Sequence, residues 1–244
     1  DTYYLKNTIS KITIALNGFE TESKIAEFDN ELLEELYQFN NKNFPGSQFR
    51  YELNRGVINE EQYAREKERE FMVIYKRLVE KYKVRLNGEK VNSFLDKWYI
   101  PSIRNETEFV FKLVKNEKNI PTKKLLAIIL SRTIRSCRAT THSDLATLKE
   151  PQFTTYYCYK HKKICKPLFS LKSWFSRYAV DTLVRIETFS KLRTEAQHAI
   201  IPADSRNVDI FDWVRKKNKK LHELLKHRKI RGIFSSPPYV GQID

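Results

Sequence analysis

Apolar residues recur at helical spacing in two long segments of the N-terminal half. The stripes consist of Ile25, Phe28, Leu32, Leu33 and Leu36 in the first segment and of Phe71, Ile74, Leu78 and Tyr82 in the second. Steps of three and four residues place these side chains on one helix face, which predicts amphipathic helices with that face buried. Asn59, followed by Glu60 and Glu61, is typical of a helix start, because carboxylates are favourable near that end of the helix dipole. We therefore predict a mainly helical region over residues 1–120.

Breaks and further stripes divide the rest of the chain. Pro45-Gly46-Ser47 and Asn87-Gly88 predict turns, since proline and glycine interrupt regular structure. A short helix is expected over Phe94 to Trp98, just before a proline. Longer helices are expected over Leu125 to Arg135 and over Ser173 to Leu192, where apolar and aromatic residues keep helical spacing.

Composition narrows the class of protein. A chain of 244 residues with 41% hydrophobic content can form one or two domains with a real core. No apolar run approaches the ~20 residues that span a membrane, so we expect a soluble protein with no membrane partner. Three cysteines are an odd number, which argues against a disulfide framework and favours a reducing cytoplasm. The 45 Lys and Arg residues against 30 Asp and Glu give a net charge of +15, which suits a nucleic acid partner.

The positive charge is concentrated near the C-terminus, whereas residues 20–36 are acidic. Between Asp209 and Arg231 the apolar residues keep helical spacing, so the basic residues of this segment lie on its outer face. The candidate phosphate contacts are Arg215, Lys216, Lys217, Lys219, Lys220, Arg228 and Lys229. The alternative is that these residues form an ordinary solvated helix face.

A short apolar strand, Ile233-Phe234-Ser235, runs into Ser236-Pro237-Pro238-Tyr239. The two prolines stiffen this loop and leave its carbonyls free as acceptors. Ser236 Oγ and the Pro237 carbonyl can accept the hydrogens of an exocyclic amino group while Tyr239 stacks on the base. Accepting those hydrogens localises the nitrogen lone pair, which is the activation that amino methylation needs. The alternative is a rigid surface turn.

These residues resemble the catalytic motif (D/N/S)-P-P-(Y/F/W) of the S-adenosylmethionine-dependent DNA amino-methyltransferases. The resemblance implies an α/β fold, part of a Rossmann-like methyltransferase sheet with a large, mainly helical domain inserted or appended. It implies double-stranded DNA as substrate, N4 of cytosine as the favoured target because the motif begins with Ser236, and a restriction endonuclease as a partner. The segment Ala199 to Arg206 resembles the strand that precedes the motif in many members, with Asp204 near the cofactor. Residues 196–244 would then be a partial α/β segment, in which residues 209–231 form the crossover helix, and residues 1–120 are the candidate target-recognition domain.

The glycine-rich cofactor loop of that family is missing. The six glycines are scattered and form no such loop; they are Gly18, Gly46, Gly56, Gly88, Gly232 and Gly241. We therefore expect these residues to be an internal piece of a larger enzyme. Two other functions stay open: an RNA base methyltransferase with the same loop, and a non-catalytic nucleic-acid-binding module in which Ser236 to Tyr239 is only a turn.

We predict a further helical region over residues 121–195, and all three cysteines fall in it together with two histidines. Cys158, His161 and Cys165 have a spacing that a tetrahedral zinc accepts, and Cys137 or His142 could complete the four ligands, with Cys137 as our choice. Nearby lysines would help to keep the thiolates ionised. A full set of protein ligands leaves no open position, so the zinc would be structural. The alternative is that reduced cysteines simply pack in the core.

Overall fold

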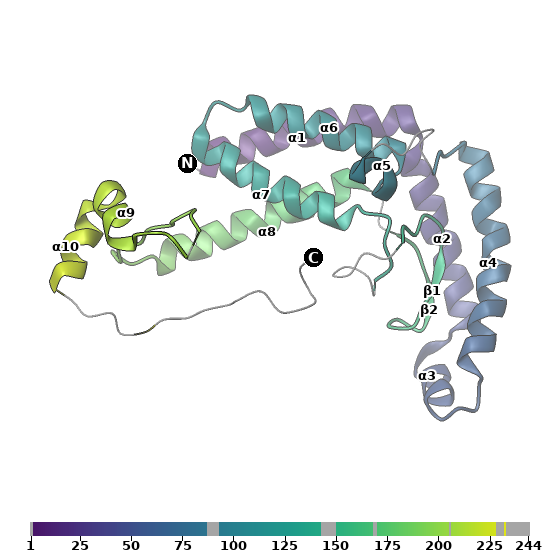
Figure 1. Ribbon diagram of the computed structural model, residues 1–244. Coiled ribbons are helices and arrows are strands. Elements are labelled where there is room, and N and C mark those ends of the chain that lie inside the picture. Colours follow the sequence, from purple (N-terminus) through teal and green to yellow (C-terminus); the bar gives the residue numbers. More distant parts are fainter. Residues whose placement is uncertain are drawn as a thin grey trace. The chain divides into compact units, whose positions relative to one another are not determined.

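The computed structural model describes residues 2–86, 93–142, 150–167, 170–204, 206–227 and 232. These residues belong to two compact units, Asp1–Thr188 and Phe189–Asp244. Helices dominate both units (Figure 1). Among the described residues, no helix is both long and apolar enough to cross a membrane.

Most of the helices belong to the first unit. They are α1 (Thr2–Ser23), α2 (Ile25–Asn43), α3 (Gly46–Asn54), α4 (Glu60–Tyr82), α5 (Phe94–Trp98), α6 (Pro101–Asn116), α7 (Ile120–Ser136) and α8 (Leu171–Leu192), the last of which runs into the second unit. The strands β1 (Tyr156–Cys158) and β2 (Lys163–Cys165) lie between α7 and α8, and the second unit contains α9 (Ile210–Lys217) and α10 (Lys219–His227).

The two helices predicted from the N-terminal stripes are confirmed as α2 and α4, which run side by side (Figure 1). Asn59 caps α4, since its Oδ1 accepts a hydrogen bond from Gln62 N at 3.1 Å. Between the helices the rings of Phe28 and Tyr75 meet edge to face, 6.1 Å apart. One member of the α2 stripe differs from the prediction, because Leu33 is 49% exposed and lies at the edge of the buried face.

The short helix over Phe94 to Trp98 and the helices over residues 125–135 and 173–192 are also confirmed, as α5 and as parts of α7 and α8. The turn predicted at Asn87-Gly88 lies outside the described residues. Helix α7 packs on α8 through an ion pair between Arg132 and Asp181 at 2.7 Å and a hydrogen bond between Ser136 and Tyr178 at 2.6 Å. One hydrophobic core extends from α1 to α8, so residues on both sides of position 120 are buried together.

Strands β1 and β2 form an antiparallel hairpin in which Tyr156 pairs with Cys165, Tyr157 with Ile164 and Cys158 with Lys163. Side chains alternate between the faces of a strand, and paired residues share a face. Tyr157 and Ile164 therefore point into the helical core, where both are buried. Tyr156, Cys158 and Cys165 point the other way and form a separate buried cluster.

In the second unit, the single helix expected over residues 209–231 is two helices, α9 and α10, broken at Asn218. The Asn218 side chain explains the break: its Oδ1 accepts from Leu221 N at 3.0 Å and so caps α10, while its Nδ2 donates to the His198 carbonyl at 3.0 Å. Residues 199–204 form neither helix nor strand. The hairpin is the one sheet among the residues that the structure describes, so the Rossmann-like sheet stays a prediction.

Candidate functional sites

The hairpin brings together four side chains with metal-binding chemistry. The ligand atoms of His142, Cys158, His161 and Cys165 all lie within 4.8 Å of one another. The Nδ1 atom of His161 is 3.6 Å from Cys158 Sγ and 3.5 Å from Cys165 Sγ. We call these four residues the Cys/His cluster.

The turn between β1 and β2 places His161 over the two cysteines. The backbone N–H groups of His161 and Lys162 both donate to the Cys158 carbonyl, at 3.0 and 2.7 Å. Lys162 then takes a positive φ of 53°, a left-handed conformation that reverses the chain into β2. A turn this tight returns Cys165 to the same face as Cys158.

His142 reaches the cluster from the segment after α7, and Tyr156 holds it there. The His142 backbone N–H donates to the Tyr156 hydroxyl at 2.8 Å, and the same hydroxyl lies 2.9 Å from His142 Nδ1. The rings of His142 and His161 meet edge to face with centroids 4.6 Å apart. Because Nδ1 of His142 is engaged by Tyr156, its Nε2 is the ring nitrogen left to act as a ligand.

Cys137, our choice for the fourth ligand, is not in the cluster. It follows the last residue of α7 and is fully buried in the helical core, where its Sγ donates to the Ser170 carbonyl at 3.7 Å. This position turns the thiol inward, toward the start of α8, rather than toward the hairpin. The spacing left Cys137 and His142 open as the fourth ligand, and the structure places His142 beside Cys158, His161 and Cys165.

Burial shifts the pKa of two members of the cluster, Cys165 and His142. It raises the pKa of the Cys165 thiol to about 12, with a further contribution from Cys158, and the nearby Lys163 lowers that pKa by less. Lys163 thus acts on the Cys165 pKa in the expected direction, but the effect of burial is larger. Burial, and then the neighbouring His161, lower the pKa of His142. The Cys165 thiol therefore loses its proton only to a strong competitor such as a metal ion.

Polar contacts tie the hairpin to α2 and α4. Asn40 of α2 pairs with the free edge of β2: its Nδ2 donates to the Ile164 carbonyl and its Oδ1 accepts from Ile164 N–H, each at 3.0 Å. Glu60 of α4 forms an ion pair with Lys162 at 2.6 Å and accepts from the Tyr157 hydroxyl at 3.1 Å. These contacts cover a strand edge that would otherwise stay unpaired.

A cavity of about 470 Å³ lies beside the cluster, between α2 and β2. His142, His161 and Cys165 contribute to its lining. The other side is formed by α2, from which Tyr37 is 70% exposed. The cluster therefore lies next to an accessible surface rather than deep inside the core.

The predicted basic residues of the second unit differ in the partners that they contact. Arg215 and Lys216 both form ion pairs with Asp212, and they hold the pKa of that carboxyl below its usual range. Lys219 and Lys220 form no ion pair with any residue that the structure describes. Lys217 lies over the Trp213 ring at 5.9 Å, and the remaining candidates, Arg228 and Lys229, lie outside the described residues.

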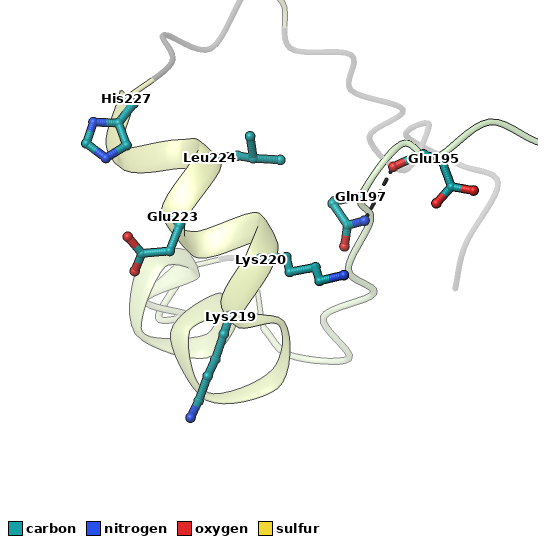
Figure 2. A pocket seen from close by; sticks show the side chains of 7 residues that line it. All are labelled: Glu195, Gln197, Lys219, Lys220, Glu223, Leu224 and His227. Carbon is teal, nitrogen blue, oxygen red and sulfur yellow. Dashed lines mark hydrogen bonds between the residues drawn. The ribbon is translucent and has the colours of Figure 1, made fainter.

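Lys219 and Lys220 line a cavity of about 600 Å³ within the second unit. Figure 2 shows the Lys220 side chain directed toward the segment that carries Glu195 and Gln197, whereas Lys219 points away from it. Gln197 donates to the Glu195 carbonyl at 3.3 Å, a contact within that segment. With Glu223 also in its lining, the cavity is of mixed charge.

The residues with the most specific predicted chemistry, Ser236, Pro237, Pro238 and Tyr239, lie outside the described residues. Asp204, the predicted cofactor contact, is exposed and forms an ion pair with Arg206 at 2.6 Å, which lowers the pKa of its carboxyl. It does not stand at the end of a strand. Among the described residues, then, nothing places Asp204 in a nucleotide-binding crevice of the kind found at the ends of parallel strands.

Comparison with known proteins identifies a relative. The chain is 45% identical, over 223 residues, to Type II methyltransferase M.MjaII of Methanocaldococcus jannaschii. The aligned residues make up 89% of this chain and 42% of that methyltransferase, so the chain spans less than half the length of the relative. No family model matches the chain, and no solved structure matches it.

The contact between Asn40 and β2 yields the first prediction. Asn40→Ala leaves both backbone polar groups of Ile164 without this partner at a half-buried edge, and we expect it to lower the free energy of unfolding by about 1–3 kcal/mol. Asn41→Ala, at the exposed neighbouring position, is the matched control and should change stability by less than about 0.5 kcal/mol. Urea unfolding measures both. Equal stability of the two variants would contradict a structural role for Asn40.

Proposed function

We propose that this chain is part of a site-specific DNA methyltransferase that modifies an exocyclic amino group, with N4 of cytosine as the target. The observation that carries the proposal is the 45% identity to a Type II methyltransferase over 89% of the chain. The segment Ser236 to Tyr239 supports the amino target, and Ser236 at its first position favours cytosine over adenine. The net charge of +15 fits a DNA substrate.

In this proposal Ser236 to Tyr239 clamp a base that has left the duplex. An enzyme cannot reach an amino nitrogen inside stacked base pairs, so the base must be extruded into a pocket. Tyr239 stacks on the extruded ring, and the acceptors at Ser236 and Pro237 take hydrogen bonds from the amino group. Both prolines keep the loop in one conformation, so the acceptors are already oriented when the base arrives.

The methyl donor in the proposal is S-adenosylmethionine. The described residues do not fit a site for it. They contain no parallel strand and no glycine-rich turn. A Cβ added to Gly18, Gly46 or Gly56 would meet open space, so these glycines do not mark a place where a ligand packs closely against the backbone. We propose that the donor is held by residues other than those described, and we assign no cofactor role to Asp204.

Residues 1–120, which lie within the first unit, are our candidate for target recognition. The variable segment of such enzymes has to approach DNA without carrying out the chemistry, which suits a region whose described elements are all helices. Lys219 and Lys220 of the second unit are the candidate phosphate contacts, since no described carboxylate pairs with them. The proposed partner is a restriction endonuclease that recognises the same DNA sequence as the methyltransferase.

The base clamp is tested by mutation of the full-length enzyme. We expect Pro237→Ala and Tyr239→Ala each to reduce methyl transfer by about 10²-fold or more, because each loses interactions made in the transition state. Radiolabelled methyl incorporation into duplex DNA measures the loss, and nucleoside analysis of the product distinguishes N4-methylcytosine from N6-methyladenine. RNA of the same sequence tests the RNA alternative.

The matched control for the clamp is Pro202→Ala, which removes an exposed proline from a segment with no helix or strand. Its activity should stay at the wild-type level. Wild-type incorporation in both Pro237→Ala and Tyr239→Ala would remove the catalytic role of the loop. No incorporation into DNA by the wild-type enzyme would remove the proposed function itself.

The basic residues give a separate prediction on binding. The double variant Lys219→Gln, Lys220→Gln should weaken binding to any duplex sequence and reduce the slope of log K against log salt by about 2, since each phosphate contact contributes about 0.9. The control is the double variant Arg215→Gln, Lys216→Gln. It removes the same amount of positive charge, but it replaces two side chains that already form ion pairs with Asp212. Fluorescence anisotropy at several salt concentrations gives both slopes. Equal slopes in the two variants would contradict the assignment.

A further inference from the structure

We propose that the Cys/His cluster binds one Zn²⁺ through His142, Cys158, His161 and Cys165, and that this ion fastens the β1–β2 hairpin. The four residues come from two separate segments, one after α7 and the other the hairpin itself. An ion shared by both would cross-link them. This site is distinct from the base clamp and takes no part in methyl transfer.

The spacing of the ligand atoms fits zinc. With Zn–S at about 2.3 Å and Zn–N at about 2.0–2.1 Å, tetrahedral angles put a bound sulfur and a bound nitrogen about 3.5 Å apart. The two sulfur-to-nitrogen distances at His161 are 3.6 and 3.5 Å. The widest separation in the set, up to 4.8 Å, has to close by about 1 Å, a shift within the reach of side-chain rotation.

The ligand types also select the metal. Two sulfurs and two imidazole nitrogens in a tetrahedral arrangement are typical of structural zinc, whereas Mg²⁺ and Ca²⁺ prefer oxygen ligands. Both cysteines are buried. Four protein ligands leave no position for water or substrate, so the role is structural. As the two Zn–S bonds form, the thiol protons of Cys158 and Cys165 pass to solvent.

Tyr156 supplies the outer support that such a site needs. A metal-bound histidine usually donates its other ring N–H to a fixed acceptor, which sets the orientation of the ring. With Nε2 of His142 on the metal, Nδ1–H donates to the Tyr156 hydroxyl, which already lies 2.9 Å away. The same hydroxyl accepts from the His142 backbone N–H at 2.8 Å, so ring and backbone are positioned together.

The experiment starts from full-length protein purified without chelator and under reducing conditions. Elemental analysis should give about one zinc per chain for the wild type and for Cys137→Ser, whose thiol lies in the core and outside the cluster. Cys158→Ser and His142→Ala should lose the metal. Tyr156→Phe keeps all four ligands but should bind zinc about 10–100-fold more weakly, as expected for loss of an outer-shell partner.

A spectrum decides the ligand set even if a ligand variant fails to fold. Co²⁺ in place of zinc in the wild-type protein should show the strong visible bands of a tetrahedral ion and sulfur-to-cobalt charge transfer of two thiolates. Charge transfer of three thiolates, or loss of zinc from Cys137→Ser, would overturn the assignment of His142. Wild-type protein without zinc that also takes up no Co²⁺ would overturn the site altogether and favour buried thiols alone.

Discussion

Tyr157 and Ile164 point from the hairpin into the helical core, and the candidate metal site depends on that contact. Strands of three residues cannot persist alone, since even longer two-stranded hairpins are marginal in water. The core contact fixes which way the hairpin faces. By alternation it then fixes the direction of Cys158 and Cys165, which must lie on the opposite face. A register shift of one residue would bury the cysteines in the core and expose the tyrosine, so one packing choice determines the chemistry of the whole segment.

Three further contacts hold the hairpin in this orientation. Asn40 occupies the edge of β2, the Glu60 ion pair with Lys162 holds the turn, and the proposed zinc joins the outer face to the segment that carries His142. Helices α2 and α4 are in turn joined to each other by ion pairs such as Glu35 with Arg77 at 2.6 Å, which use part of the acidic charge of residues 20–36. Contacts with the helices of the first unit thus hold the hairpin in place.

Sequence patterns predicted a helix well where an apolar stripe and a cap coincide, as in α4 with Asn59. The stripe of α1, formed by Leu5, Ile9, Ile12 and Leu16, was also present in the sequence and was missed. The three ligands of one hairpin were found because their spacing is local. The fourth ligand could not be chosen between Cys137 and His142 from the sequence, because the choice depends on whether a side chain at the end of α7 turns into the core. Likewise, the break at Asn218 depends on a contact with the distant His198 carbonyl, which no local pattern reveals.

The central claim is that a metal at the outer face holds a hairpin that the core alone holds only partly. Amide hydrogen exchange on the full-length protein, with and without a zinc chelator, tests this most directly. We predict that chelation speeds exchange at the paired residues of β1 and β2, including the Ile164 amide that donates to Asn40, while the amides of α2 and α4 keep their protection. Unchanged protection of the hairpin after complete removal of zinc would contradict the account.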